Sequence, residues 1–427
     1  MTPKLKKLQN GMTLVTVPQK GATSCTIFVM VRVGSRYETK EINGASHFVE
    51  HVMFKGTKRR PNTQILTQTL DRYGAEYNAY TGKDVTAYYV KIEAGQASLA
   101  VDLLHDMVFH SLYKPKEIDK ERGVILEEIN MYEDNPLMHL EDLLEQALFS
   151  QSTLGWNIAG PREVIRTITP QQLVQYRDAY YIPERVSVVL AGKIPTGIYE
   201  QIEKSFGKER QKKEQSDIPY APFLAPSKIK APVIVQKKET EQVQLGIGFH
   251  ALSTSDKDAP TAKLLANILG GGMSSRLFSE IREKRGLCYT IRAGHESLED
   301  VGIFSITAGL DKTRIEAATK AIMHELKKIS EHAVLKDELQ RAKDNLRGRA
   351  MLAFEDSATQ AEWFARQWTF KKELQTPEQL MKKIDRVKGS DIKALAKRLF
   401  DPAHMAVAAI GPIASEKALA QYFKLSS

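Results

Sequence analysis

The sequence is organised around the stretch His47-Phe48-Val49-Glu50-His51, which follows Asn43-Gly44-Ala45-Ser46. Two histidines four residues apart lie on one face of a helix, one turn apart, close enough for both imidazoles to bind one Zn²⁺. Glu50 comes three residues after His47 and faces the same side, where it can deprotonate a water on the metal. The order H-x-x-E-H is the inversion of the usual zincin order H-E-x-x-H.

The alternative interpretation of this stretch is a helix with two exposed histidines and a solvated glutamate. Histidine is scarce, at 10 of 427 residues, and chance would produce the motif in on the order of one such chain in a hundred. The residues around the motif are apolar on most sides, which predicts a buried helix: Phe48, Val49, Val52, Met53 and Phe54. Buried histidines beside a buried glutamate need partners, and a metal ion supplies them.

Length and composition predict a globular protein of two to four domains, because 427 residues exceed one ordinary core. No apolar run is long enough to span a membrane, and the N-terminus lacks the apolar segment of a signal peptide, so we expect a cytoplasmic protein. The net charge of +9 is interleaved with acids and predicts no nucleic-acid binding. Cys25 and Cys288 lie in apolar, strand-like surroundings typical of buried thiols rather than of a disulfide.

The first half of the chain alternates β-rich and helical patterns. Strands are predicted at 12–17, 25–33, 76–81, 85–92 and 185–192. The histidine helix should end near Gly56, and further helices are predicted at 62–73, 96–111, 115–132 and 136–149.

The second half restarts the same pattern. A segment rich in Lys, Gln, Pro and Ser predicts a boundary, which divides the chain into domains 1–210 and 231–427 joined by a linker 211–230. The second domain has a strand at 243–249, a hairpin at 288–308, and helices at 258–269, 275–284, 313–330 and 335–353.

The two halves also end alike, since the separation between Pro183 and Pro402 equals that between Gly192 and Gly411. We therefore predict an α+β protein with two homologous domains, each an antiparallel-rich β-sheet flanked by helices. The second copy has no H-x-x-E-H at the equivalent residues 262–266, which predicts one Zn²⁺ per chain.

A hydrolytic zinc site needs a third protein ligand and an open position for water. Glu121 and Glu128 are seven residues apart and share one face of a predicted helix, whereas Glu127 is rotated by about 100°. The alternative is a solvated acidic helix, and the spacing alone leaves this choice open.

Residues 43–57 and 121–136 resemble the pitrilysin metallopeptidase family, which includes mitochondrial processing peptidase. The family carries an H-F-L-E-H-type helix and, at a nearly constant separation downstream, a ligand glutamate; Glu128 follows His51 at that separation. The resemblance implies that His47, His51 and Glu128 bind the metal and that Glu121 supports the site. It also implies that Asn78, Ala79 and Tyr80 form an edge strand that pairs with the substrate backbone.

The run Ile281-Arg282-Glu283-Lys284-Arg285-Gly286-Leu287-Cys288-Tyr289 resembles a motif in the family's second half. There an arginine and a tyrosine seven residues apart contact the substrate near the scissile bond, which implies a catalytic role for Arg282 and Tyr289. Taken alone, these residues are typical of a surface charge and a packed strand aromatic. The stretch 152–157, Ser-Thr-Leu-Gly-Trp-Asn, departs from the His-Pro-Leu-Gly run of many relatives.

We expect a zinc endopeptidase in which Glu50 is the general base and peptides or unfolded segments are cleaved. The family builds a closed chamber from four such domains, so a homodimer would form a clamshell, with Arg282 and Tyr289 acting on the partner's zinc. Two alternatives stay open. In the first, the chain is a non-catalytic structural or peptide-binding subunit, which the intact zinc motif disfavours. In the second, the chain is one half of a heterodimer.

Overall fold

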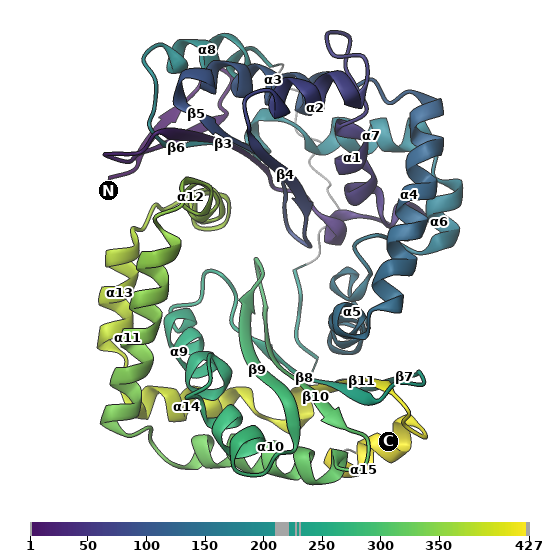
Figure 1. The fold of residues 1–427 in the computed structure, drawn as a ribbon, viewed down its shortest axis with the longest axis vertical. Coiled ribbons are helices and arrows are strands. Elements are labelled where there is room, and N and C mark those ends of the chain that lie inside the picture. Colours follow the sequence, from purple (N-terminus) through teal and green to yellow (C-terminus); the bar gives the residue numbers. More distant parts are fainter. Residues whose placement is uncertain (1, 210–221, 227–228, 230–231, 424–427) are drawn as a thin grey trace. The chain divides into compact units, whose positions relative to one another are not determined.

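The computed structural model describes residues 2–209, 222–226, 229 and 232–423, and each of its two compact units contains one sheet (Figure 1). The first unit consists of Met1–Ile129, Asn157–Tyr220 and Met351–Thr376. The second consists of Asn130–Trp156, Ala221–Ala350 and Pro377–Ser427. The predicted α+β class with one sheet in each half is therefore confirmed.

The first sheet has six strands, and its edge strand β4 borders the histidine helix. Their order is β1 (Lys4–Lys7), β2 (Thr13–Pro18), β6 (Val186–Gly192), β3 (Ser24–Val31), β5 (Thr86–Glu93) and β4 (Glu76–Thr81). Among these described strands only β2 and β6 pair in parallel; the other neighbours are antiparallel. β1 and β2 form a hairpin around Asn10-Gly11, and β4 and β5 form a hairpin around residues 82–84.

The central strands of the first sheet are buried on both faces. Ile27 and Val29 of β3 pack into a core with the helices α1 (Ala45–Met53), α3 (Ala97–His110) and α7 (Pro170–Tyr180). Phe28 and Met30 point to the other face, where α12 (Ser357–Lys371) covers them with Phe364. Burial on both faces explains why the β3 sequence is continuously apolar instead of alternating. The remaining helices are α2 (Thr63–Asp71), α4 (Pro115–Asp134), α6 (Arg162–Thr167) and α8 (Ile198–Lys204).

The second sheet repeats the strand order of the first. Its strands run β7 (Val233–Lys237), β11 (Met405–Gly411), β8 (Gln242–Ala251), β10 (Gly302–Asp311) and β9 (Cys288–Ser297). Again one pair, β7 with β11, is parallel, and the other neighbours are antiparallel. The order corresponds strand for strand to β2-β6-β3-β5-β4, which confirms the predicted duplication. The helix equivalent to α1 is α9 (Ala259–Gly270), whose buried residues include Ala262, Leu265 and Ala266 in place of histidines.

Helices also cover both faces of the second sheet. The main core lies against α9, α10 (Ile315–Glu331), α11 (Lys336–Ala353), α13 (Pro377–Arg386), α14 (Gly389–Leu399) and α15 (Glu416–Phe423). The opposite face receives α5 (Pro136–Leu148). This helix packs directly onto the backbone of β8, because a Cβ at Gly248 would lie only 2.7 Å from Cδ1 of Leu148. A glycine is therefore required at this crossing.

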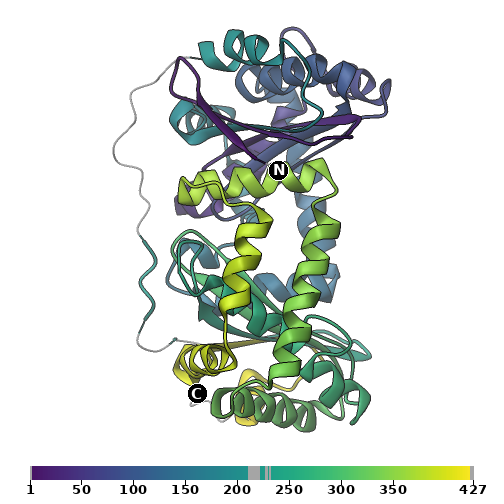
Figure 2. The same cartoon turned by 90° about the vertical axis from the view of Figure 1, so that its left-hand side faces the viewer.

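Each unit takes one covering helix from the other half of the sequence, an exchange that the sequence analysis did not predict. Figure 2 shows α12, in yellow-green, beside the strands of the first sheet, and its contacts with β3 and β6 agree. Most of the predicted linker 211–230 lies outside the described residues, so the domain limits 1–210 and 231–427 stay a prediction.

The structure also bears on the predictions for the helix at 275–284, for the two cysteines and for membrane spans. The helix predicted at 275–284 is a short π-helical segment, Phe278–Glu283. Cys25 is a buried free thiol, and Cys288 is a half-buried one. Across the described part of the chain, no helix combines the length and the apolar character that crossing a membrane requires. The cytoplasmic location stays a prediction.

Candidate metal centre

The helix that carries the H-x-x-E-H motif begins at a buried carboxyl group. Glu38 accepts hydrogen bonds from the backbone N–H groups of Gly44 and Ser46, both at 2.7 Å, and from the Asn43 side chain at 2.8 Å. Gly44 has φ 99°, and a Cβ there would lie 2.6 Å from the carbonyl oxygen of Ala159, so this start requires glycine. Burial raises the pKa of Glu38 to about 7, against the lowering effect of its donors.

The apolar side of α1 fixes the direction of its polar side. Phe48, Val49, Val52 and Met53 are buried in the core of the first unit. The intervening His47, Glu50 and His51 then face β4 and α4. This arrangement follows from the helical period, as predicted from the sequence.

His47, His51 and Glu128 converge with the spacing of a zinc site. Nε2 of His47 lies 3.2 Å from Nε2 of His51 and 3.6 Å from Oε2 of Glu128, and Nε2 of His51 lies 3.4 Å from the same oxygen. Tetrahedral zinc with bonds of about 2.0–2.1 Å places its ligand atoms roughly 3.3 Å apart. The donor set and its separations therefore fit Zn²⁺ without rearrangement.

Glu121 lies on the other side of His51 and shares one face of α4 with Glu128. Its Oε2 is 3.1 Å from Nδ1 of His51, and its Oε1 is 2.5 Å from Nζ of Lys55. Burial acts to raise the pKa of Glu121, but its bonds to His51 and Lys55 lower it overall. An ionised Glu121 fixes the orientation of the ring and directs Nε2 toward the metal position.

The pKa values of the two histidines are shifted in opposite directions. Burial and the neighbouring His51 lower the pKa of His47 to about 4. Burial also acts to lower the pKa of His51, but hydrogen bonds to Glu121 and Glu128 raise it to about 9. Hydrogen bonding to His51 lowers the pKa of Glu128 despite its partial burial. The carboxylates thus compensate one positive charge at the place where a cation would bind.

Glu50 is not among these three ligands and points to β4. Its Oε2 accepts a hydrogen bond from Oγ1 of Thr81, the last residue of that strand. Burial raises the pKa of Glu50, and the bond to Thr81 opposes that shift. A largely buried carboxyl with a raised pKa, held beside a metal position by a hydroxyl, has the properties of a general base.

The predicted substrate strand is the edge strand β4, which pairs with β5 only among the described strands. Asn78 is exposed, and Tyr80 donates its hydroxyl to Oε1 of Glu362 on α12 at 2.8 Å. Ala79 and Thr81 point to the opposite face, toward the α1 side, in accordance with the period of two. One backbone edge of this strand is therefore free of sheet partners within the described residues.

Arg282 and Tyr289 belong to the second unit, where they lie together. Cζ of Arg282 is 4.6 Å from the ring centre of Phe278 and 5.5 Å from that of Tyr289. Tyr289 is the second residue of the edge strand β9 and is 70% exposed. The π-helical segment that holds Arg282 follows Arg276, which forms two 2.7 Å bonds to Glu338 of α11. The structure thus places the partly buried Arg282 beside the exposed Tyr289.

Sequence reasoning missed three supporting groups: Glu38, Lys55 and Thr81. Each of these residues lies outside the H-x-x-E-H motif, and its partner is brought to it by the fold. A period-two count places Thr81 on one face of β4, but only the packing of α1 against β4 identifies Glu50 as its partner.

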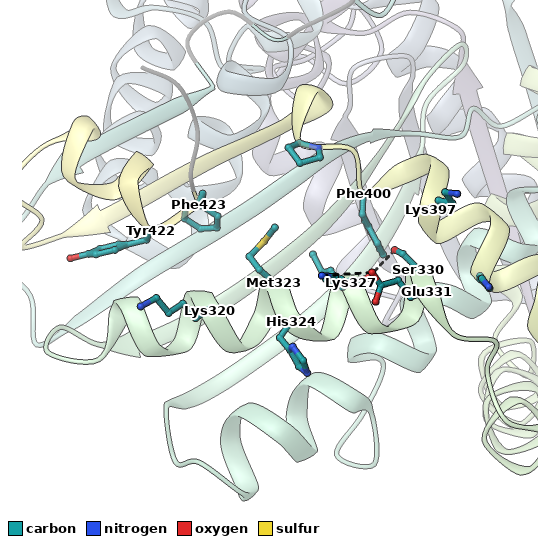
Figure 3. A pocket seen from close by; sticks show the side chains of 13 residues that line it. Lys320, Met323, His324, Lys327, Ser330, Glu331, Lys397, Phe400, Tyr422 and Phe423 are labelled. Atoms are coloured by element: carbon teal, nitrogen blue, oxygen red, sulfur yellow. Dashed lines mark hydrogen bonds and ion pairs between the residues drawn. The ribbon is translucent and has the colours of Figure 1, made fainter.

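The second unit contains a separate pocket of about 790 Å³ between α10, α14 and α15 (Figure 3). Met323, Phe400 and Phe423 supply apolar lining, and lysines surround it at positions 320, 327, 393 and 397. Its lining includes a single histidine, His324, and a single carboxylate, Glu331. The described residues that line this pocket therefore offer no pair of histidines with a carboxylate like His47, His51 and Glu128.

Comparisons with known proteins identify the family of this chain and similar folds. Residues 13–162 match the family model described as "Insulinase (Peptidase family M16)", and residues 167–346 match "Peptidase M16 inactive domain". The chain is 34% identical over 404 residues to a protein of Bacillus subtilis named "uncharacterized zinc protease", covering 95% of this chain and 97% of that one. It is 31% identical over 414 residues to a Streptomyces coelicolor protein with the same description, covering 96% and 90%.

Solved structures show the same two-unit fold. A protease from Helicobacter pylori has a TM-score of 0.90 at 24% identity and covers 96% of this chain and 99% of its own. A Pseudomonas fluorescens structure described as a peptidase M16 inactive domain has a TM-score of 0.86 at 18% identity, covering 97% and 100%. The family models and the named relatives define a half-size protein of the peptidase type. The chain belongs to peptidase family M16, the pitrilysin-type family, as the sequence resemblance predicted.

Proposed function

We propose that this protein is a zinc-dependent endopeptidase that cleaves peptides or unfolded segments at the His47–His51 site. The observation that carries the proposal is the convergence of His47, His51 and Glu128 with separations of 3.2 to 3.6 Å. Two imidazoles and one carboxylate leave a fourth tetrahedral position open, which is the arrangement of catalytic zinc. Relatives named zinc proteases support the same assignment.

His47, His51 and Glu128 would hold the ion, and bound Zn²⁺ would supply Lewis-acid activation of the attacking water and the peptide carbonyl. Glu50 accepts the proton of that water, and Thr81 holds its carboxylate in place through the hydrogen bond to Oε2. The same carboxyl then donates the proton to the leaving amine, so that proton transfer balances over one cleavage. Glu121 keeps the His51 ring in position throughout.

The substrate binds, in this proposal, as an extended strand along β4. The unpaired backbone edge of β4 offers N–H and C=O groups at the spacing of a peptide strand, and Thr81 at its end reaches Glu50. Pairing through main-chain groups gives affinity with little dependence on sequence. It also requires an extended chain, which favours peptides and unfolded segments over folded proteins.

Arg282 and Tyr289 are proposed to contact the substrate near the scissile bond. A guanidinium and a phenol are donors that steady the oxyanion of a tetrahedral intermediate. Their mutual contact and the exposure of Tyr289 support a role in binding something beyond the second unit. We further propose a homodimer in which this pair acts on the partner's zinc site and encloses a chamber.

The second candidate is a non-catalytic peptide-binding subunit. The family description of the second half as an inactive domain agrees with the apolar residues that α9, described over its whole length, carries in place of metal ligands. The first half, however, retains both histidines, Glu50 and Glu128 in contact geometry, which a subunit that only binds would not need. The catalytic proposal therefore takes precedence.

The substitution Glu50→Gln tests the proposal because it keeps the shape of the side chain and removes the base. We expect zinc content equal to wild type and cleavage of a quenched peptide slower by about 10²–10⁴-fold. The matched control is Glu127→Gln, which changes an exposed glutamate on α4. Cleavage by Glu50→Gln at the wild-type rate would refute the assignment of Glu50.

A further inference from the structure

We propose that the first unit holds a second divalent transition-metal site, of the zinc class, formed by His105, His110 and Glu209. These residues lie at the end of α3 and directly after the short helix Phe206–Lys208. None of them belongs to the H-x-x-E-H site. The inference is independent of the proposed peptidase function.

Three ligand atoms converge here from two separate segments. Nε2 of His105 lies 2.7 Å from Oε1 of Glu209, and Nε2 of His110 lies 3.3 Å from the same oxygen. One potential ligand atom from each residue falls within 4.8 Å of the others. The His110 separation already equals the roughly 3.3 Å expected between tetrahedral ligands, and the His105 separation needs to open by about half an ångström.

The donor set matches that of the H-x-x-E-H site. Both clusters offer two imidazoles and one carboxylate, and these are the two groups of this kind among the described residues. Two imidazole nitrogens with a carboxylate oxygen suit Zn²⁺ and neighbouring transition metals rather than Ca²⁺ or Mg²⁺. The two histidines come from one helix and the carboxylate from a distant part of the sequence, so the cluster is set by the tertiary fold.

The surroundings hold these groups in place. The His105 ring packs edge-on against Phe206, with ring centres 5.1 Å apart, and lies 5.8 Å from Phe109. The buried Asn10 donates from Nδ2 to the carbonyl oxygens of Phe206, at 2.8 Å, and Glu209, at 3.1 Å. An apolar wall and a fixed backbone are the outer-shell features that orient metal ligands.

A plain ion pair between His105 and Glu209 is the competing explanation. It accounts for the 2.7 Å contact but gives no reason for His110 to approach the same oxygen, since His110 is 49% exposed. An exposed imidazole gains little from a second, longer contact with a carboxylate. A bound cation, in contrast, attracts all three groups.

Metal at this position would join α3 to the segment that ends the first half. Glu209 is the last described residue before 210–221. Coordination would therefore fasten the chain to the first unit at the point where it continues to the second half. The expected role is structural, with stabilisation that depends on metal concentration.

The test is zinc stoichiometry of the full chain, measured by elemental analysis after chelator treatment, reloading with zinc and removal of excess. Wild type should bind two zinc ions per chain, and His110→Ala should bind one while it cleaves peptide at the wild-type rate. Loss of a ligand should weaken this second site by more than the roughly 10–100-fold typical of outer-shell changes. His332→Ala, which removes an exposed histidine far from both clusters in sequence, is the matched control and should bind two.

A second variant, Glu209→Gln, keeps the side-chain shape and should also bind one zinc ion. Zinc should raise the unfolding temperature of wild type more than that of either variant. One zinc per chain in wild type, unchanged in His110→Ala and Glu209→Gln, would overturn the inference. His51→Ala separates the two sites: if it lost no zinc while His110→Ala lost one, the second site would stand and the proposed catalytic site would fail.

Discussion

Glu121 lies 3.1 Å from Nδ1 of His51, on the edge of the ring opposite the nitrogen that approaches Glu128. Lys55 contacts the other oxygen of the same carboxylate. His51 is therefore held between two glutamates that are seven residues apart on α4. In the proposed site these glutamates have different roles: Glu128 would bind the metal, and Glu121 would orient the ring of His51.

Glu121→Gln tests this division of tasks. The amide keeps the shape of the side chain but removes the negative charge that stabilises the Nδ1–H of His51. We expect zinc affinity at the catalytic site to fall by about 10–100-fold, with peptide cleavage recovered at high zinc concentration. Affinity is measured by competition with a chromophoric chelator. Glu127→Gln is the control, and equal affinity of the two variants would contradict the assigned role.

Thr81→Val removes the hydroxyl that holds Glu50 and retains the β-branched shape. A hydrogen bond to a charged group contributes about 1.5–3 kcal/mol, so kcat should fall by about 10–100-fold. KM should change little, because Thr81 acts through Glu50. Thr81→Ser should restore most of the rate. A change confined to KM, or no recovery in the serine variant, would show that Thr81 contributes through strand structure instead.

The difference in stability between wild type and Glu38→Gln should depend on pH. Burial raises the pKa of Glu38 from 4.5 to about 7, so between these values the folded chain retains a proton that the unfolded chain has lost. The stabilisation that Glu38 contributes is complete below its unfolded pKa of 4.5, and it is lost as the pH rises through its folded pKa of about 7. The free energy of unfolding of wild type relative to Glu38→Gln should fall by up to about 1.4 kcal/mol per pH unit in this interval.

The measurement is thermal unfolding of both chains at pH 5 and pH 8, with chelator present so that metal binding does not contribute. The advantage of wild type over Glu38→Gln should be larger at pH 5. A difference that is the same at both pH values would contradict a raised pKa of Glu38.

The proposed dimer predicts complementation between two inactive chains. One carries Glu50→Gln, and the other carries Arg282→Ala with Tyr289→Ala. If the arginine and tyrosine act on the partner's zinc, each mixed dimer contains one intact site out of two and should recover up to about half of the wild-type rate per dimer. Mixed dimers are verified by two affinity tags. Absence of activity in verified mixed dimers would count against action across the interface.

Much of the fold and of the metal centre follows from local patterns in the sequence. The helical period placed His47, Glu50 and His51 on one face, and a seven-residue spacing placed Glu121 with Glu128. The repeat that relates Pro183 to Pro402 predicted two sheets of equivalent order. These predictions depend on the periods of the helix and the strand, which a sequence displays directly.

No periodic pattern in the sequence predicts the exchange of covering helices between the two units. α5 and α12 each bury apolar side chains against a sheet, but the sequence pattern does not say which sheet, and only packing determines that α12 covers Phe28 and Met30. The same holds for Thr81, Lys55 and Glu38, whose hydrogen-bond and ion-pair partners lie on other elements of the fold. The His105–His110–Glu209 cluster likewise joins residues from distant parts of the sequence.

Catalysis by zinc at the His47–His51 helix is tested by comparing wild type with His51→Ala for zinc content and for cleavage of a quenched peptide on the same samples. We expect His51→Ala to bind one zinc ion fewer and to show no measurable cleavage. Chelator should abolish cleavage by wild type, and added zinc should restore it. Wild-type cleavage by His51→Ala, or cleavage that persists after all zinc is removed, would contradict the assignment of a catalytic zinc site to this helix.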